Sequence, residues 1–441
     1  MTFDEPVTAL PEESATAEQR LGRLQVWLRG RRADLAFVFG VLAWFAITQR
    51  WTSWSSGIRL LGEADVASYA PMAAAAPGLP HIRLGSDFTQ RFVVHYCVGL
   101  LAKATGLSLP AAYRAAWVVV FLAIVVTVVQ LLWRLGVVGL GFRVCVAVLV
   151  LSPYAFRYYA IVPGMLADPV FELGLALSLL GAVSRRVGVL LAGVVVAIVA
   201  RQTALLTVPV LAMWLLVDAH WQGLGPRRRW FGAAALAALP GAGYVAIHLA
   251  TASFSKPYAP RIPQDTVLPL LGRLPGTASE LTSHVLHSLA PLVLIVALLA
   301  AVALARRRGG WSPALSAGLV GPLAMGCAVL AQTLAISPDF PGLAFNEPRL
   351  SALGLIAFVV ALAVEFARTP AQMPAGRATE AAIYALLALG SLHDIYSVVG
   401  PSSTGQFLIV QLAAGAALVP LILMRLAGHG AGAPGAARTP A

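Results

Sequence analysis

The chain has 441 residues, of which 59% are hydrophobic and only 11% are charged, and its mean hydropathy is +0.80. Soluble domains carry about a quarter of charged residues, so this composition excludes a soluble protein and indicates a polytopic membrane protein. The net charge of +12 comes mainly from arginines that flank apolar stretches. It therefore indicates contact with lipid head groups and argues against nucleic-acid binding.

The two ends of the sequence differ in composition from the middle. Residues 1–33 are first acidic and then basic, with no apolar segment that could act as a signal peptide, so we expect a cytoplasmic tail. Residues 428–441 are rich in Gly, Ala and Pro, which predicts a disordered cytoplasmic tail. Between them, 34–427 is predicted to be one multi-pass domain in the inner (plasma) membrane.

Apolar runs in this domain predict an all-α fold with about twelve membrane-spanning helices, since a span needs about 20 mostly apolar residues. The predicted spans are 34–50, 114–133, 136–153, 165–184, 187–200, 203–218, 230–250, 288–305, 313–335, 350–367, 379–397 and 405–424.

The segment 88–106 is apolar enough to span but carries Arg91, His95 and Lys103. If it spanned, the arginine-rich loops at 184–186 and 226–229 would face outward, against the positive-inside tendency. We therefore expect an amphipathic surface helix here, with a spanning helix as the alternative. The first extracytoplasmic loop then runs over 51–113, which is too long for a simple connector and predicts further surface helices.

This loop contains an acid-x-acid pair, Glu63 and Asp65, with Tyr69 one helical turn beyond Asp65. Two neighbouring carboxylates can divide the work of accepting a proton and of orienting a hydroxyl or holding a cation. The plain alternative is a pair of solvated acids near the start of a short helix, where they favour its dipole.

Further ionisable residues fall at the same predicted face. Arg157 lies among aromatic residues, and Asp168 and Glu172 are one turn apart near the outer end of a span, where such groups usually face a cavity or a partner. A structural polar pair between helices is the alternative for these acids.

Arg201, followed by Gln202, separates two apolar runs, and Glu347 and Arg349 directly precede another. Arginine suits phosphate because its planar fork donates two parallel hydrogen bonds. The alternatives are snorkelling of Arg201 to head groups and a simple ion pair between Glu347 and Arg349.

Four stretches resemble segments of the GT-C class of integral-membrane glycosyltransferases. The run GEADVASYAPMAAAAPGLP, followed by RFVVHYCVGLLAKATGLSLPAAYR, is similar to the first loop of that class, with its acidic motif and amphipathic helices. RYYAIVPGMLADPVF and ARQTALLTVP resemble recurring segments of bacterial members. The resemblance covers residues 34–350.

The resemblance implies a hexosyl- or pentosyltransferase that uses a polyprenyl-phosphate sugar and a glycan or lipid acceptor of the cell envelope. Asp65 would be the general base and Glu63 would assist it, with a divalent cation as a possible cofactor. The substrate-binding candidates are Tyr69, Arg91, Arg157, Asp168, Arg201, Gln202, Glu347 and Arg349.

Two other functions fit the same features. A transporter or flippase for a lipid-linked or anionic substrate also places arginines and acids within helices. A non-catalytic membrane protein of envelope assembly would carry them without a shared cavity.

Overall fold

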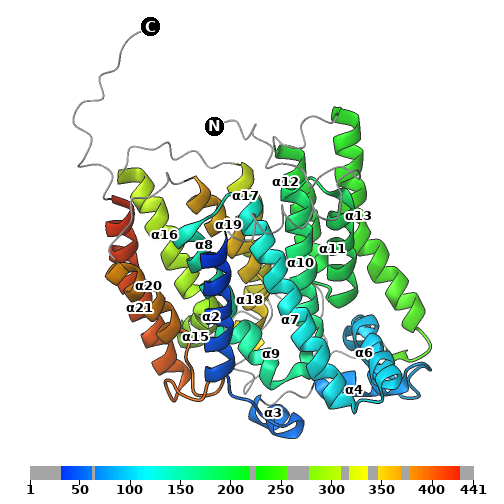
Figure 1. Cartoon of the computed structure of the whole chain (residues 1–441). Coiled ribbons are helices and arrows are strands. Elements are labelled where there is room, and N and C mark those ends of the chain that lie inside the picture. The colour runs from blue at the N-terminus through cyan, green and yellow to red at the C-terminus, as the bar shows by residue number, and fades with distance from the viewer. Residues whose placement is uncertain are drawn as a thin grey trace, which may run out of the picture.

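The structure, a computed structural model, describes residues 31–61, 65–218, 225–256, 278–308, 317–335, 346–368 and 377–427. These residues form a bundle of helices that run between two ends of the molecule (Figure 1). Helix α2 starts and α21 finishes at the upper end in that view, and α3, α4 and α6 lie at the opposite, lower end. The predicted tails, 1–30 and 428–441, lie outside the described residues.

The first half of the chain supplies the lower-end helices and the hairpin that positions the site. Its elements are α2 (Arg32–Thr48), α3 (Trp54–Leu61), α4 (Val66–Ala75), β1 (Leu84–Gly85), α5 (Ser86–Thr89), α6 (Phe92–Thr105), α7 (Leu109–Arg134), α8 (Gly139–Leu151), the π-helix η1 (Pro153–Arg157), α9 (Tyr158–Ile161), the 3-10 helix η2 (Pro163–Met165), α10 (Ala167–Val183), α11 (Val187–Ala200) and α12 (Ala204–Val217).

The second half closes the bundle. Its described elements are α13 (Pro226–Thr251), β2 (Ser255–Lys256), α15 (Ala278–Leu289), the 3-10 helix η4 (Ala290–Leu292), α16 (Val293–Arg308), α17 (Ala317–Ala335), α18 (Asn346–Ala352), α19 (Leu355–Ala367), α20 (Arg377–Gly390) and α21 (Thr404–Ala427).

Five helical segments among the described residues are long and apolar enough to cross a membrane: Leu109–Arg134, Gly139–Ile161, Pro226–Thr251, Thr282–Ala305 and Gly405–Leu426. Each of the twelve predicted spans coincides with a helix, but a count of twelve spans is not established. Helices α11 and α12 show why, since each has 14 residues. At about 1.5 Å per residue they reach about 21 Å, less than the roughly 30 Å of a hydrocarbon core.

Several predicted boundaries are wrong, each for a local reason. The span predicted at 379–397 ends at Gly390, because the chain leaves the helix at Ser391 and forms a bridge between Gln49 and Ser397. The span predicted at 350–367 is interrupted by a turn between α18 and α19. Helix α7 begins at Leu109, with Pro110 in its first turn, so the first loop is shorter than 51–113.

The first loop folds into the short helices that its length predicts. Helix α6 has 14 residues and is too short to cross a bilayer by itself. It packs against α4 and α7, and its buried face includes Val94, His95 and Val98. Strand β1 pairs in parallel with β2, which fastens the loop to the end of α13. The surface-helix interpretation of 88–106 stays a prediction, because α11 and α12 have the same length as α6.

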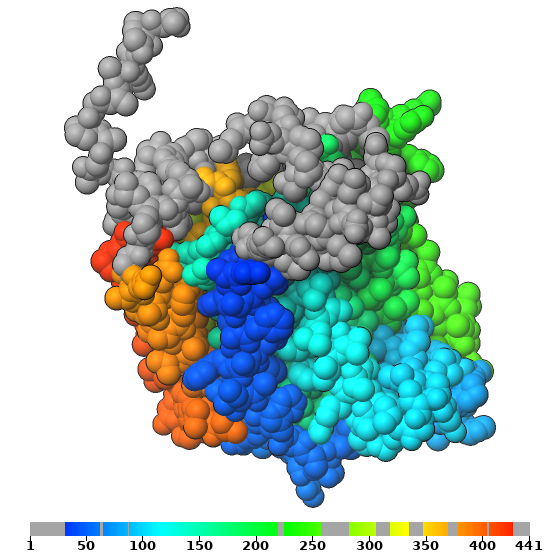
Figure 2. Space-filling view, viewed as in Figure 1, coloured from blue at the N-terminus to red at the C-terminus, as the bar shows by residue number. Residues whose placement is uncertain are grey.

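The core lies around α8, α10 and α19. Every residue of α19 from Leu355 to Phe366 is buried, whereas α13 is mostly exposed. On the face turned to the viewer, α2 lies between the residues of α20 and those of α7 (Figure 2).

Candidate functional site

The candidate site is built on the carboxylate of Asp168, which is completely buried. Its Oδ1 pairs with Nη1 of Arg201, and its Oδ2 lies 3.5 Å from Nε of Arg349. The hydroxyl of Tyr159 donates to Oδ2 at 3.0 Å. With three donors around it, this carboxylate has little capacity left to accept a proton from a substrate.

The helical hairpin of α10 and α11 brings Asp168 and Arg201 together. Asp168 is in the first turn of α10, and Arg201 directly follows α11, so an antiparallel pair of helices sets them side by side. Gly174 and Gly193 permit the close packing, because a Cβ on either would lie 2.4 Å from a backbone nitrogen of the facing helix. Each charge also suits its helix end, since acids favour the N-terminus and bases the C-terminus.

The π-helix η1 and the helix after it position the tyrosines of the site. The hydroxyl of Tyr158 accepts a hydrogen bond from Nη1 of Arg349 at 3.4 Å, and the guanidinium of Arg349 lies 5.9 Å from the centre of the same ring. Tyr159 is the next residue and reaches Asp168. Both tyrosines were missed from the sequence, although they stand directly after Arg157 in the aromatic run SPYAFRYY.

Arg91 connects this buried centre with the first loop. It donates to the hydroxyl of Tyr69 and interacts electrostatically with Asp65, Asp168, Arg201 and Arg349. Burial, followed by the charge of Arg201, lowers the pKa of Arg91 to about 9, so its guanidinium stays charged at neutral pH.

Asp65 directly precedes α4, is only half-buried, and lies within the electrostatic reach of Arg91. Its partner in the predicted acid pair, Glu63, lies outside the described residues. Of the two predicted catalytic carboxylates, Asp65 thus lies within electrostatic range of Arg91, and its catalytic role stays a prediction.

His95 packs against the ring of Tyr69. The sequence interpretation did not assign this histidine to the site. The ring of His95 stacks on that of Tyr69 with centroids 4.1 Å apart, and its Nδ1 lies 2.8 Å from the hydroxyl of Tyr113. Burial, and then the charge of Arg91, lower the pKa of His95 to about 3, so the ring is neutral at physiological pH. The sequence signal that could have indicated His95 is its place in the apolar segment 88–106, between Arg91 and Lys103.

Glu172 lies one turn beyond Asp168 on α10 and is 1% exposed. Neither of its carboxyl oxygens has a hydrogen-bond partner among the described residues. A buried carboxyl group without a donor strongly favours its uncharged form.

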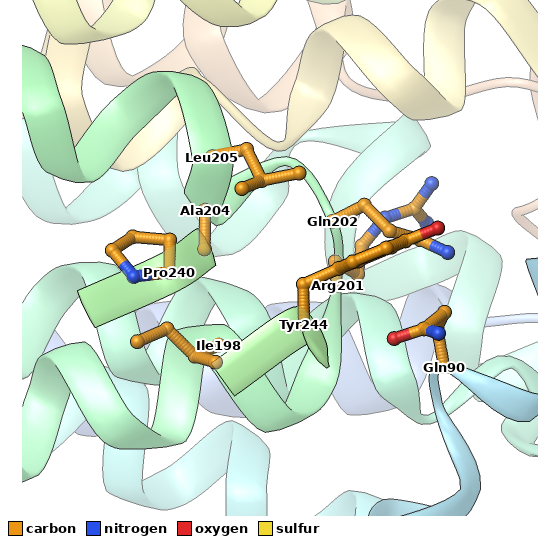
Figure 3. Close-up of a pocket in the computed structure, with 8 residues that line it drawn as sticks. All are labelled: Gln90, Ile198, Arg201, Gln202, Ala204, Leu205, Pro240 and Tyr244. Carbon is orange, nitrogen blue, oxygen red and sulfur yellow. The ribbon is translucent and has the colours of Figure 1, made fainter. Parts of the chain in front are cut away.

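A small pocket opens beside Arg201, between α11, α12 and α13 (Figure 3). Arg201, Gln202 and Gln90 gather on one side of it, and Ile198 and Pro240 lie on the other. The wall also includes Leu205 and Tyr244, which are 40% and 39% exposed. The pocket thus has a partly exposed apolar wall and, within it, the buried guanidinium of Arg201.

Two of the predicted substrate-binding residues lie apart from Asp168. The carboxylate of Glu347 forms a hydrogen bond with Nδ1 of His284 at 3.1 Å. The alternative prediction of a simple ion pair between Glu347 and Arg349 is therefore wrong. Residues two apart on a helix do not face each other, and α18 turns Arg349 toward Asp168 instead.

Arg157 is the other outlying residue. It is completely buried, donates to Oγ1 of Thr48 at 2.8 Å and lies 5.1 Å from the centre of the Phe45 ring. Its own carbonyl accepts a hydrogen bond from the side chain of Gln49 at 3.2 Å. These contacts tie η1 to the end of α2.

Within the described ranges, no group of three or more His, Cys, Asp or Glu side chains could hold a metal ion. The carboxylate of Asp168 is occupied by guanidinium groups and a tyrosine, which suits no cation. Of the pair Glu63 and Asp65, which could jointly hold a cation, Glu63 lies outside the described residues.

No family model matches the chain, and no curated protein sequence matches it. One solved structure is similar, that of the arabinofuranosyltransferase AftD from mycobacteria, at 17% sequence identity and a TM-score of 0.41. The similarity covers 90% of this chain and 27% of AftD, so the chain spans about a quarter of the length of that protein.

Proposed function

We propose that the chain is a membrane glycosyltransferase that moves a sugar from a polyprenyl-phosphate donor to a hydroxyl of an envelope glycan or lipid. The observation that carries this proposal is the convergence of Arg201 and Arg349 on Asp168, within electrostatic range of Arg91 and beside a pocket with an apolar wall. A lipid phosphate needs both parts, since its anionic head requires guanidinium donors and its tail requires an apolar surface.

The charges of the site suit a phosphodiester. Among the described residues, Arg201 and Arg349 pair with the carboxylate of Asp168, and Arg91 interacts electrostatically with Asp65 and Asp168. Several guanidinium groups thus lie near one buried carboxylate, an arrangement that suits an anionic ligand such as a lipid-phosphate sugar. In this arrangement Asp168 holds the arginines in place until the phosphate takes over some of their hydrogen bonds.

The reaction follows from these positions. The acceptor oxygen attacks the anomeric carbon, the bond from that carbon to the phosphate oxygen breaks, and its electron pair stays on the phosphate. Asp65 takes the proton of the acceptor hydroxyl. The leaving lipid phosphate gains one negative charge while Asp65 loses one, so the arginine-rich site matches the product as well as the donor. Arginines that face the developing charge lower the barrier by a few kcal/mol for each well-placed donor, roughly.

Incubating the purified protein with a panel of polyprenyl-phosphate sugars and acceptors, and measuring transferred sugar, tests the proposal. We expect Asp65→Asn to lower kcat by about 10²- to 10⁴-fold, the usual contribution of a positioned base. Asp394→Asn is the matched control, because it removes a carboxylate from the 391–403 loop, where Asp394 contacts His393. Full activity of Asp65→Asn at normal expression would remove Asp65 from the role, and no transfer or hydrolysis with any donor would reject the function.

A further inference from the structure

Helix α18, which carries Arg349, has only seven residues. Helices this short are not stable in water on their own, so the contacts around α18 must fix its position. It lies next to α15 (Figure 1) and packs against α15, α17, η1 and η4. Whatever fixes the rotation of α18 therefore also decides where the guanidinium of Arg349 lies.

A histidine of α15 contacts α18 on the side away from Arg349. The side chain of His284 is buried, and its Nδ1 lies 3.1 Å from Oε1 of Glu347. Its Nε2 lies 3.2 Å from the carbonyl oxygen of Leu334, near the end of α17. Glu347 and Arg349 are two positions apart on α18, so they do not share a face. The bond to His284 and the pairing of Arg349 with Asp168 thus hold α18 from different sides.

The partners of the His284 ring determine how many protons the pair of His284 and Glu347 holds. The carbonyl of Leu334 can only accept a hydrogen bond, so Nε2 carries a proton. The bond between Nδ1 and the carboxyl group needs a second proton, which sits on the ring or on Glu347. In both cases the pair holds one proton more than a neutral imidazole and a carboxylate. When that proton leaves to the solvent, one ring nitrogen faces an acceptor with its lone pair, and one of the two bonds is lost.

The elements packed against His284 carry few other ionisable groups among their described residues. They are Glu280 and His287 on α15, Cys327 on α17 and Arg349 on α18, and η4 carries none. His287 is partly exposed and lies 3.2 Å from Oγ of Ser283 through its Nδ1. Since both nitrogens of His284 already have partners, Glu347 is the charged group that bonds directly to its ring.

We infer that His284 and Glu347 are positioning residues for Arg349, and that the proton they share holds α18 in the rotation that directs Arg349 to Asp168. The guanidinium is then held where the lipid phosphate is proposed to bind. As the pH rises and the shared proton leaves, α18 loosens and Arg349 loses this fixed position. The inference rests on the proposed function, because the activity it supports is phosphate binding by Arg349.

The test compares Glu347→Gln with the wild type, as full-length protein in lipid nanodiscs. A glutamine amide donates to Nδ1 of a neutral imidazole while Nε2 still donates to Leu334, so this variant keeps both bonds at neutral and alkaline pH. We expect the kcat/KM of Glu347→Gln for a polyprenyl-phosphate sugar, divided by that of the wild type, to rise at least about three-fold from about pH 6 to about pH 9. The ratio cancels titrations that the two proteins share, such as that of Asp65.

Glu347→Leu removes the bond at every pH. We expect it to lower kcat/KM by about 10- to 100-fold at about pH 6, because a displaced substrate-binding group costs this much. His287→Gln is the matched control, since it removes the next histidine of the same helix, and it should keep the pH profile of the wild type. Should Glu347→Leu fold poorly, the ratio for Glu347→Gln still decides the inference.

Hydrogen–deuterium exchange of the α18 amides gives a readout that does not need activity. Exchange in the wild type, divided by that in Glu347→Gln at the same pH, should also rise from about pH 6 to about pH 9. If the wild type transfers no sugar from any donor, the proposed function fails, and exchange alone then decides the inference. An exchange ratio that stays constant with pH would overturn the inference. In an active enzyme, a constant kcat/KM ratio or an unimpaired Glu347→Leu would overturn it as well.

Discussion

Two arginine centres lie buried near the lower end of the bundle, and they differ in what faces the guanidinium. Arg201 and Arg349 share the carboxylate of Asp168, and Arg201 borders a pocket. Arg157 is buried more completely, yet no ion pair joins it to a carboxylate among the described residues. Instead, Arg157 donates a hydrogen bond to Thr48 and its guanidinium lies over the ring of Phe45. Burial alone therefore does not mark a ligand-binding arginine, and we propose that a counter-ion which a ligand can replace does.

Replacing Asp168 should have the largest effect, because it removes the counter-ion that distinguishes the two arginine centres. Asp168→Asn leaves two buried guanidinium groups without their carboxylate, and we expect it to cost about 3–5 kcal/mol of unfolding free energy. Thermal unfolding in detergent measures the loss. If a phosphate takes over from Asp168, a polyprenyl phosphate should raise the Tm of the variant more than that of the wild type. An equal shift in both proteins would mean that the arginines do not exchange partners.

Substitutions of Arg201 test ligand binding separately from the stability of the fold. Arg201→Gln removes a donor from the pocket, and we expect kcat/KM for a lipid-phosphate sugar to fall by about 10²- to 10³-fold, as for other donors that face developing charge. Arg201→Lys keeps the charge but not the planar fork and should recover only part of the activity. Arg59→Gln, on the exposed face of α3, is the matched control and should leave kcat/KM unchanged. A loss no greater than in this control would place the phosphate elsewhere.

Much of the order of the helices follows from the sequence, because apolar runs separated by arginines mark where the helices lie along the chain. The pairing of Asp168 with Arg201 also follows in principle, since two spans joined by a short turn are antiparallel and bring these ends together. The partners of Arg349 and Glu347 do not, because they depend on how α18 is rotated against α15 and η1. Arg157 shows the same limit. An arginine among aromatic residues is equally compatible with a ligand site and with a bond to Thr48, and only the position of α2 decides between them.

Arg157 should behave in the opposite way to Arg201. Arg157→Met removes the bond to Thr48 and the contact over Phe45, and we expect a loss of about 1–3 kcal/mol in unfolding free energy. The kcat/KM of the folded fraction should stay within about three-fold of the wild type, a difference of less than about 0.7 kcal/mol in transition-state stabilisation. Unfolding curves and kinetics on the same preparation separate the two quantities. A large drop in kcat/KM with unchanged stability would instead assign Arg157 to the substrate.

The smallest expected effect is the acid sensitivity that His95 contributes on the Asp168 side. The pKa of this histidine is lowered from 6.5 to about 3 in the folded protein, so the unfolded chain binds the proton more tightly. Stability is then complete above the unfolded value and is lost as the pH falls below it, by about 1 kcal/mol between pH 6.5 and 5.5. His95→Gln, which stays neutral and can still form a hydrogen bond with Tyr113, should remove the part of the slope that comes from His95, whereas His248→Gln on the exposed face of α13 should keep it. Unfolding free energies at the two pH values measure the difference. Equal slopes in the wild type and His95→Gln would mean that His95 can take up a proton without opening the packing of Tyr69 and Arg91.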